Sequence, residues 1–314
     1  MIRCCNTPKV RNIINREITK HCRRFWSGVF GFAVRHLSKT GLAQSRPMVN
    51  IYHRLSNKLI GSEEVEVHVH GQTMYVDAAF GLTLKSAGTY MSESLMTEIF
   101  AKLVTEGMTV VDVGAHAGYY TLIAARAVGD KGRVFSFEPE PSNYQLMLKN
   151  IQLNNHLNVT PVQKAVSDKT GHIKLFLAED ASGHSTVSEK PDQRSIQVDS
   201  TSLDDFFTDR IQQINVIKID VEGAENAVLQ GMSSIIDKNP ELIIFTEFCP
   251  DALKKAGCLP TGYLKKLADY GFVIYLIDEK KHSLVVAEVG RIMKVCQSIG
   301  YVNLLCQRGK RGLP

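Results

Sequence analysis

The 314-residue sequence lacks the cysteine pattern of a zinc site or of a disulfide framework. Its seven cysteines are odd in number, and none forms a CxxC pair. Cysteines used in this way indicate reduced thiols inside a cell. The closest histidine pair, His68 and His70, lies in an alternating segment typical of a half-exposed strand. We therefore expect no metal site.

Long apolar runs are also absent. The longest run, residues 25–34, is interrupted by Gly28 and Gly31 and is far too short to span a bilayer. Arginine and lysine residues are spread through the first 24 positions, where a secretory signal would carry a continuous apolar core. The sequence therefore indicates neither a spanning helix nor a secretory signal.

Positive charge is scarce outside the N-terminal arm. Residues 1–48 hold ten Lys/Arg against one acid, Glu17, so the remainder has 27 Lys/Arg against 31 Asp/Glu and a net charge of −4. A nucleic-acid-binding domain usually presents a basic face that neutralises phosphates. We therefore expect no nucleic-acid partner for this part of the chain.

The basic arm has apolar residues at helical spacing between residues 10 and 38. Three interpretations remain open: a helix docked on the domain, a peripheral membrane contact, and an arginine-rich organelle presequence. We expect a cytoplasmic protein, with membrane association through residues 10–38 and an organelle presequence as the alternatives. The oligomeric state is not indicated.

The rest of the chain predicts an α/β domain. Residues 63–77 have the alternation of a hairpin with Gly71 at its turn, and strands then alternate with helices, as in a parallel sheet with right-handed crossovers. We divide the chain into a basic helical extension (1–60), a hairpin lead-in (61–87) and a catalytic domain (88–314). The predicted strands are 109–113, 133–137, 159–162, 215–219, 242–247, 272–277 and 301–306, and the predicted helices are 93–103, 119–127, 142–154, 224–230 and 261–270.

A glycine loop follows the first of these strands. TVVDV runs into GAHAG and then into a helix near Tyr119, so Gly114 and Gly118 lie at the carboxyl edge of the sheet, where open α/β sheets bind ligands. The helix N-terminus suits a ligand carboxylate. Asp112 suits a ligand ammonium and would repel a pyrophosphate.

A second acidic residue follows the glycine loop. Glu138 ends the next strand, twenty residues after Gly118, where a carboxylate can accept hydrogen bonds from both ribose hydroxyls. The loop is DxGxxxG, whereas dinucleotide binding would require GxGxxG. The spacing predicts a nucleoside pocket and disfavours a nicotinamide oxidoreductase.

Five motifs lie between residues 88 and 250: VVDVGAHAGYYTL, VFSFEPEPSNYQLMLKNIQLNN, AVSD, VDSTSLDDF and above all VIKIDVEGAE. Through these motifs the sequence resembles the FkbM family of methyltransferases. This resemblance implies a Rossmann-like class I methyltransferase fold, with a mostly parallel seven-stranded sheet and helices on both faces. It also implies S-adenosylmethionine as methyl donor and a hydroxyl of a sugar, polysaccharide or secondary metabolite as acceptor.

The resemblance also implies which residues hold the cofactor. These are Asp112, Gly114 and Gly118 on the methionine side, Glu138 at the ribose, and Ser167 with Asp168 at the adenine edge. The family loop usually carries Asn where this chain has His116. His116 is therefore either a cofactor contact of altered strength or a turn residue.

Acidic residues at later strand ends are candidates for catalysis, because a neutral hydroxyl needs a general base. Asp220 is the first candidate, with capping of the following helix as its alternative role. Glu222, Glu225, Glu247 and His184 are the others. Asp220, Glu222 and Glu247 could instead hold Mg²⁺. A further alternative is that the protein is a cofactor-binding scaffold without turnover.

Overall fold

The computed structural model describes residues 64–77, 94–177, 194–209 and 213–309. The basic arm and His184 lie outside these ranges, so the predictions made for them stay predictions. The chain divides into two compact units, and residues 68–75, 92–179 and 183–314 form the second. Of the first unit, only residues 64–67 and 76–77 are described. In the described ranges, no helix is long and apolar enough to cross a membrane.

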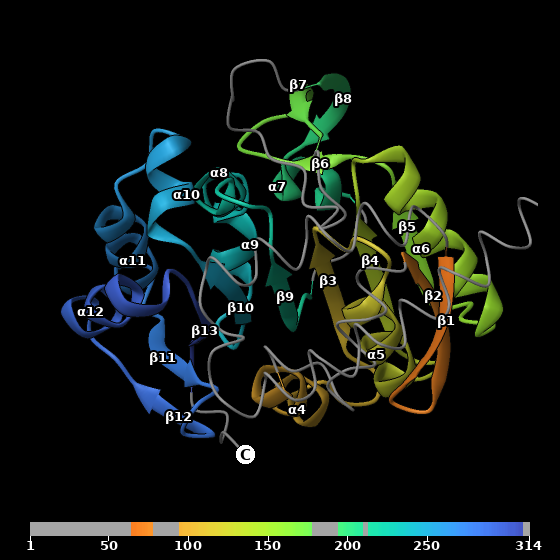
Figure 1. Cartoon of the computed structure of the whole chain (residues 1–314), viewed down its shortest axis with the longest axis horizontal. Coiled ribbons are helices and arrows are strands. Elements are labelled where there is room, and N and C mark those ends of the chain that lie inside the picture. Colours follow the sequence, from red (N-terminus) through yellow and green to blue (C-terminus); the bar gives the residue numbers. More distant parts are fainter. Residues whose placement is uncertain (1–63, 78–93, 178–193, 210–212, 310–314) are drawn as a thin grey trace, which may run out of the picture. The chain divides into compact units, whose positions relative to one another are not determined.

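A mostly parallel sheet forms the centre of the second unit (Figure 1). Its strand order is β12-β11-β13-β10-β9-β3-β4-β5. The five strands from β10 to β5 run parallel, whereas β13 is antiparallel to both β10 and β11. The strands are β3 (Thr109–Val113), β4 (Arg133–Phe137), β5 (Val159–Val162), β9 (Val216–Ile219), β10 (Ile243–Phe248), β11 (Val273–Asp278), β12 (Ser283–Val286) and β13 (Val302–Gln307).

All seven strands predicted from the sequence are present, with boundaries within one residue, and the predicted fold class is confirmed. The eighth strand, β12, was not predicted. Among the described strands, this short edge strand pairs with β11 alone, and it has no fully buried residue. Such a strand lacks the continuous apolar run that marks the inner strands.

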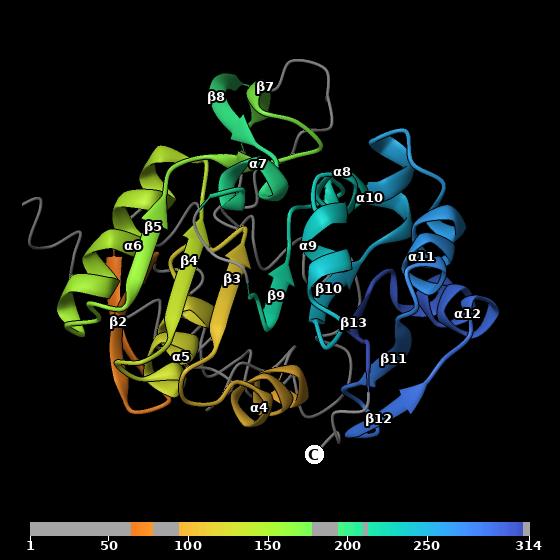
Figure 2. The same cartoon turned by 180° about the vertical axis from the view of Figure 1, so that it is seen from behind.

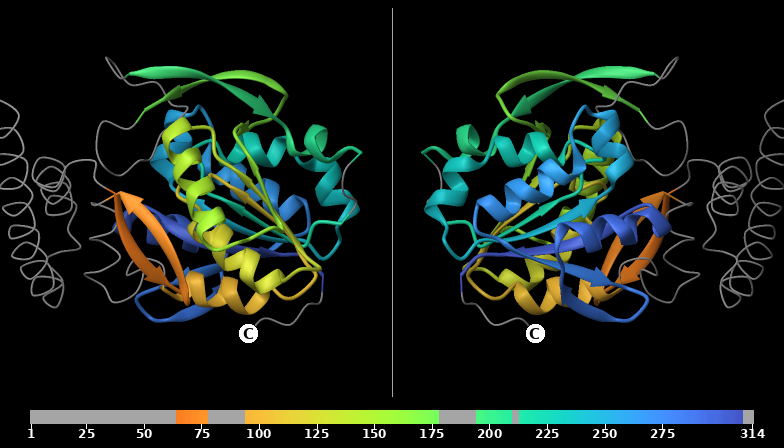
Figure 3. Two further views of the ribbon diagram at one scale, coloured as in Figure 1. Left: turned by 90° about the vertical axis from the view of Figure 1, so that its right-hand side faces the viewer. Right: turned by 90° about the vertical axis from the view of Figure 1, so that its left-hand side faces the viewer.

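Helices cover both faces of the sheet (Figure 3). Successive residues of β10 show the two faces, because Phe245 packs edge-on against Phe100 while Thr246 hydrogen-bonds the Tyr263 hydroxyl at 2.9 Å. The first face carries α4 (Ser94–Leu103) and α5 (Tyr119–Val128). The right-handed crossover from β4 to β5 places α6 (Pro141–Leu153) on that face too.

The second face carries the larger apolar core. It contains Val111 and Val113 of β3 and Phe135 and Phe137 of β4. Helices later in the chain pack against these side chains. Phe135 packs edge-on against Phe207, with ring centroids 5.0 Å apart. These later helices are α7 (Leu203–Phe207), α8 (Glu225–Gln230), α9 (Ser233–Lys238), α10 (Pro250–Lys255), α11 (Pro260–Asp269) and α12 (Val289–Ile299).

A second, three-stranded sheet lies beyond the carboxyl ends of β3 and β4 (Figure 2). Its order is β6-β8-β7, formed by β6 (Ala165–Val166), β7 (Gly171–Phe176) and β8 (Ser195–Thr201). This sheet was not predicted from the sequence. Most residues of β7 and β8 are exposed or half-buried, so these strands carry only a weak apolar pattern.

The predicted hairpin is confirmed as β1 (Glu64–Val69) and β2 (Gln72–Asp77). Its two turn residues, His70 and Gly71, both have positive φ, at 47° and 70°. Two consecutive left-handed residues are what a two-residue type I′ turn needs, because they match the twist of the strands.

Side-chain amides of α6 bind the backbone of β2. The amide of Asn150 accepts from the Tyr75 N–H at 2.7 Å and donates to the Tyr75 carbonyl at 2.8 Å. Asn154, one turn later, makes the same pair of bonds with Thr73. Asn150 also donates to the carbonyl of Ala117, in the glycine loop, at 2.8 Å. The two asparagines thus bind backbone groups of β2 as a second neighbouring strand would, and Asn150 connects β2 to the glycine loop.

We predict that Asn150→Ala lowers the free energy of unfolding by about 2 to 4 kcal/mol, because it leaves three backbone groups without this fully buried partner. Urea denaturation measures the change. Gln152→Ala is the matched control, since this amide is exposed on the same helix, and it should cost less than about 0.5 kcal/mol. Equal stability of both variants would show that the amide bonds are dispensable.

Candidate active site

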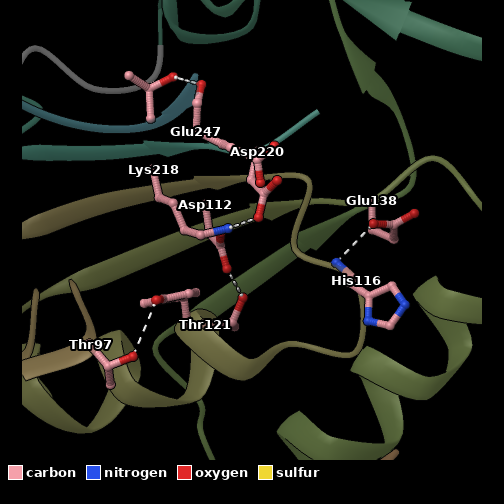
Figure 4. A network of polar contacts seen from close by, with 10 residues as sticks. Thr97, Asp112, His116, Thr121, Glu138, Lys218, Asp220 and Glu247 are labelled. Carbon is pink, nitrogen blue, oxygen red and sulfur yellow. Dashed lines mark hydrogen bonds and ion pairs between the residues drawn. The ribbon is translucent and has the colours of Figure 1, made fainter. Parts of the chain in front are cut away.

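The acids predicted from the sequence gather at one edge of the sheet. Asp112 of β3, Glu138 after β4, Asp220 after β9 and Glu247 of β10 all lie at or near the carboxyl ends of parallel strands. Figure 4 shows them around the glycine loop. Because parallel strands end on the same side of a sheet, residues separated by more than a hundred positions in the chain meet here.

Asp112 is a buried carboxylate at the centre of this group. Its side chain points to the α5 face of β3, where its Oδ2 accepts a hydrogen bond from the Thr121 hydroxyl at 2.7 Å. The Thr121 hydroxyl makes a second hydrogen bond with Ser136, at 2.8 Å. The other oxygen of Asp112, Oδ1, has no hydrogen-bond partner among the described residues. Burial raises the pKa of Asp112, and the nearby Lys218 ammonium opposes that rise.

Gly114 is required by packing within the protein. Its φ is +79°, and an added Cβ would lie 1.8 Å from the backbone carbonyl oxygen of Asp220. At Gly118 the φ is +90° and the nearest atom to an added Cβ is the Met147 Cγ, at 3.1 Å. We expected glycine here to let a ligand approach the backbone. At Gly114 the closest neighbour is instead the end of β9, so this glycine joins the loop to the Asp220 segment.

Glu138 is held in place by two backbone groups. Its Oε2 accepts from the His116 N–H at 2.8 Å and its Oε1 from the Glu140 N–H at 2.9 Å. The side chain is buried, and this burial raises its pKa to about 7, while the two backbone hydrogen bonds act in the opposite direction. Both oxygens thus have fixed directions and retain lone pairs for further donors.

His116 contacts Glu138 through its backbone, while its φ of 52° places it in the left-handed region. Asparagine adopts this region more readily than most residues, which explains why Asn suits this position in the resembling family. The observed contact with Glu138 does not involve the imidazole. A role of the His116 side chain in binding stays a prediction.

Lys218 was missed in the sequence and lies in the middle of the site. Its Nζ is 2.9 Å from Asp220 Oδ2 and 4.7 Å from the centre of the Tyr120 ring. In the sheet it is the register neighbour of Asp112. A lysine inside the otherwise apolar strand VIKI was the available signal. Asp220 is this lysine's ion-pair partner. Ala224 is the N-cap residue of α8, so capping as the alternative role of Asp220 is wrong.

The turn after β9 contains the other two acids of KIDVEGAE. Glu222 is half-buried and has a φ of 50°. Glu225 is buried, accepts from the Gly223 N–H at 3.0 Å through Oε1, and has no partner for Oε2 among the described residues. Burial raises the pKa of Glu225 to about 7. Glu225 thus supports the turn from within.

The remaining predicted residues are less central. Glu247 lies beside Asp220 at the end of the next strand (Figure 4). Ser167 and Asp168 follow β6, where the Ser167 N–H donates to Thr201 and Asp168 is exposed. Across the described ranges, no three His, Cys, Asp or Glu side chains are grouped as metal ligands.

The site suits a ligand that carries an amine and neighbouring hydroxyls. The buried Asp112 Oδ1 lacks a partner among the described residues and can receive an ammonium group. The Glu138 carboxylate is held by the N–H groups of His116 and Glu140 and can accept hydrogen bonds from two hydroxyls. The methionine and ribose parts of S-adenosylmethionine carry these groups, so the residues present fit the cofactor that the sequence resemblance implies.

We predict that Gly114→Ala destabilises the fold by about 3 kcal/mol or more, because the carbonyl of Asp220 cannot yield to a methyl group. Gly107→Ala is the control: its φ is nearly the same, +81°, but no atom of the described residues lies within 4 Å of the added Cβ. It should cost about 1 to 2 kcal/mol, the strain of the left-handed region alone. Thermal unfolding separates the two, and similar losses would refute the close contact.

A family model described as "Methyltransferase FkbM domain" matches residues 112–278. A second model, "Protein-L-isoaspartate(D-aspartate) O-methyltransferase (PCMT)", matches residues 38–170. Among individual proteins, "Methyltransferase 1" of Beauveria bassiana is 27% identical over 45% of this chain and 64% of its own length. "Hexuronic acid methyltransferase AglP" of Haloferax volcanii is 29% identical over 40% of this chain and 50% of its length. The chain thus spans less than two thirds of these relatives.

Solved structures that are similar to this chain include a SAM-dependent O-methyltransferase from Thermotoga maritima. It is 14% identical and covers 79% of this chain and 86% of its own, with a TM-score of 0.39. TYW2 of M. jannaschii in complex with AdoMet is 13% identical, covering 78% and 84%, with a TM-score of 0.41. The family model spans more than half of the sequence and includes the glycine loop, Glu138 and Asp220, and the chain belongs to the FkbM methyltransferase family.

Proposed function

We propose that this protein transfers a methyl group from S-adenosylmethionine to a hydroxyl of a glycan or small-molecule acceptor. The observation that carries the proposal is the pair of buried carboxylates, Asp112 and Glu138, on either side of the glycine loop in a chain of this family. Asp112 would receive the methionine ammonium and Glu138 the ribose hydroxyls.

The sulfonium supplies an already activated methyl group, so the protein has to align the acceptor oxygen and remove its proton. Asp220 is the candidate base. It lies at the end of β9, its side chain is 29% exposed, and Lys218 holds one of its oxygens at 2.9 Å. Because this side chain is partly exposed, its carboxylate can meet an acceptor that enters from solvent while Lys218 holds it in place.

A hydroxyl acceptor is supported by family membership and by one relative, whose printed name is hexuronic acid methyltransferase. Glu222 and Glu247, with His184, are the further candidates for contacting the acceptor. The competing proposal, a scaffold that binds the cofactor without turnover, predicts the same pocket and differs only in having no product.

For the N-terminal arm, we propose a peripheral membrane contact through residues 10–38.

We predict that binding of S-adenosylhomocysteine weakens as the pH falls below about 7. Burial raises the pKa of Glu138 to about 7, so the ligand-free protein gains a proton there below that pH, whereas the carboxylate is the form that accepts from two hydroxyls. Each pH unit below the pKa should raise Kd about tenfold. Calorimetric titration between pH 8 and 6 measures this.

Two variants assign that pH dependence. Glu138→Gln cannot ionise, so it should bind more weakly and lose the slope. Glu225→Gln is the matched control, because burial raises the pKa of Glu225 to about 7 as well, yet its carboxylate supports the turn after β9. It should keep the slope. A slope that survives in Glu138→Gln would remove Glu138 from the ribose site.

We predict that Asp220→Asn lowers methyl transfer by about a hundredfold or more, the contribution typical of a general base. It should change the Kd of S-adenosylhomocysteine less than about threefold, because the amide keeps the shape of the side chain. Transfer of label from methyl-labelled S-adenosylmethionine into a cell extract, followed by mass spectrometry, gives the activity. Asp130→Asn, an exposed acid after α5, is the control.

The two proposals give different results in this assay. Label in an extract component with the unaltered protein supports the transferase. If the protein binds S-adenosylhomocysteine but labels nothing in extracts of its own source, the scaffold gains support. Full activity of Asp220→Asn would exclude Asp220 as the base.

A further inference from the structure

Lys218 is a buried cation between two carboxylates. Its side chain is 4% exposed, with its ammonium 2.9 Å from Asp220 and over the ring of Tyr120. On the neighbouring strand it faces Asp112, whose ionised form it favours. Asp112 is itself buried and has one oxygen without a partner among the described residues. The cluster therefore brings together one ammonium group and two carboxyl groups.

Stability alone is a poor reason for this arrangement. Removing an ammonium group from water costs several kcal/mol, and apolar side chains of similar volume often replace buried ion pairs without loss of stability. The strand around Lys218 is apolar, and Phe245, its register neighbour on β10, packs against Phe100. Apolar side chains could replace the whole charged group in these surroundings, so the presence of the charges indicates a function.

The charge of the methyl donor gives that function. The sulfonium is positive before transfer and becomes a neutral thioether after it, so two uncompensated carboxylates would favour the donor over the transition state, in which this charge is already decreasing. Interactions that are stronger in the ground state than in the transition state do not accelerate a reaction. A fixed cation beside the carboxylates reduces this unwanted preference.

We propose that Lys218 balances the charge of Asp112 and Asp220 and thereby limits the preference of the pocket for the cationic donor over its neutral product. This inference rests on the proposed function, since it requires that the site binds these two ligands. Lys218 acts through the two carboxylates and has no direct part in the chemical step. It also keeps the Asp220 carboxylate in position at the end of β9.

The test compares S-adenosylmethionine with S-adenosylhomocysteine by calorimetric titration of the full chain. The two ligands share their amino-acid and nucleoside parts, and they differ in the methyl group and its positive charge. In Lys218→Met the affinity ratio should shift about tenfold toward S-adenosylmethionine, because both carboxylates then act on the sulfonium uncompensated. Lys218→Arg, which keeps the charge, should restore most of the original ratio.

Two controls separate charge from structural damage. A merely structural role of Lys218 would weaken both ligands equally and leave their ratio unchanged. Lys131→Met makes the same substitution at a surface lysine whose side chain is 80% exposed, and it should alter neither affinity. Asp220→Asn removes a negative charge at a half-exposed position, and the ratio should shift about tenfold toward S-adenosylhomocysteine.

The outcomes distinguish this inference from the proposed function. A ratio in Lys218→Met within about twofold of the original overturns the charge-balancing role. If Lys218→Met does not fold, Asp220→Asn decides, and an unchanged ratio there overturns the inference equally. If the unaltered protein binds neither ligand, the proposed function fails and this inference fails with it.

Discussion

The close packing of the glycine loop against the end of β9 is the constraint on which the site depends. An added Cβ on Gly114 would lie 1.8 Å from the carbonyl oxygen of Asp220, so the loop after β3 and the segment after β9 are in direct contact. This contact places Asp112 and Asp220, which lie far apart in the sequence, in one group of charges. Asn150 supports the loop from its other side through the carbonyl of Ala117.

Alternation along the strands decides which residues enter this group. Val111 and Val113 point into the large apolar core, and Asp112 between them points to the α5 face, where it meets Thr121. In β9 the same alternation buries Ile217 and Ile219 in the core and turns Lys218 toward Tyr120. Polar residues inside apolar strands thus form the interior of the site. Burial raises the pKa of Asp112 and strengthens its interactions with other charges.

The sequence allowed much of this fold and part of the site to be predicted. The inner strands carry continuous apolar runs, so their boundaries were found within one residue, and the loop and Glu138 were found from spacing. The small sheet of β6, β7 and β8 was missed because its strands are largely exposed. Lys218 was missed because a single lysine in VIKI has no periodic pattern, and its importance comes from neighbours on other strands.

The α/β class, the family resemblance and the acids at the strand ends could be predicted from the sequence, because hydrophobic periodicity and motif spacing are local properties of the chain. The folded protein was needed to show that Glu138 is anchored by the backbone of His116 and Glu140, that Gly114 serves packing against β9, and that Lys218 pairs with Asp220. These features depend on distances between separate segments and on burial from water, which exist only once the sheet has assembled.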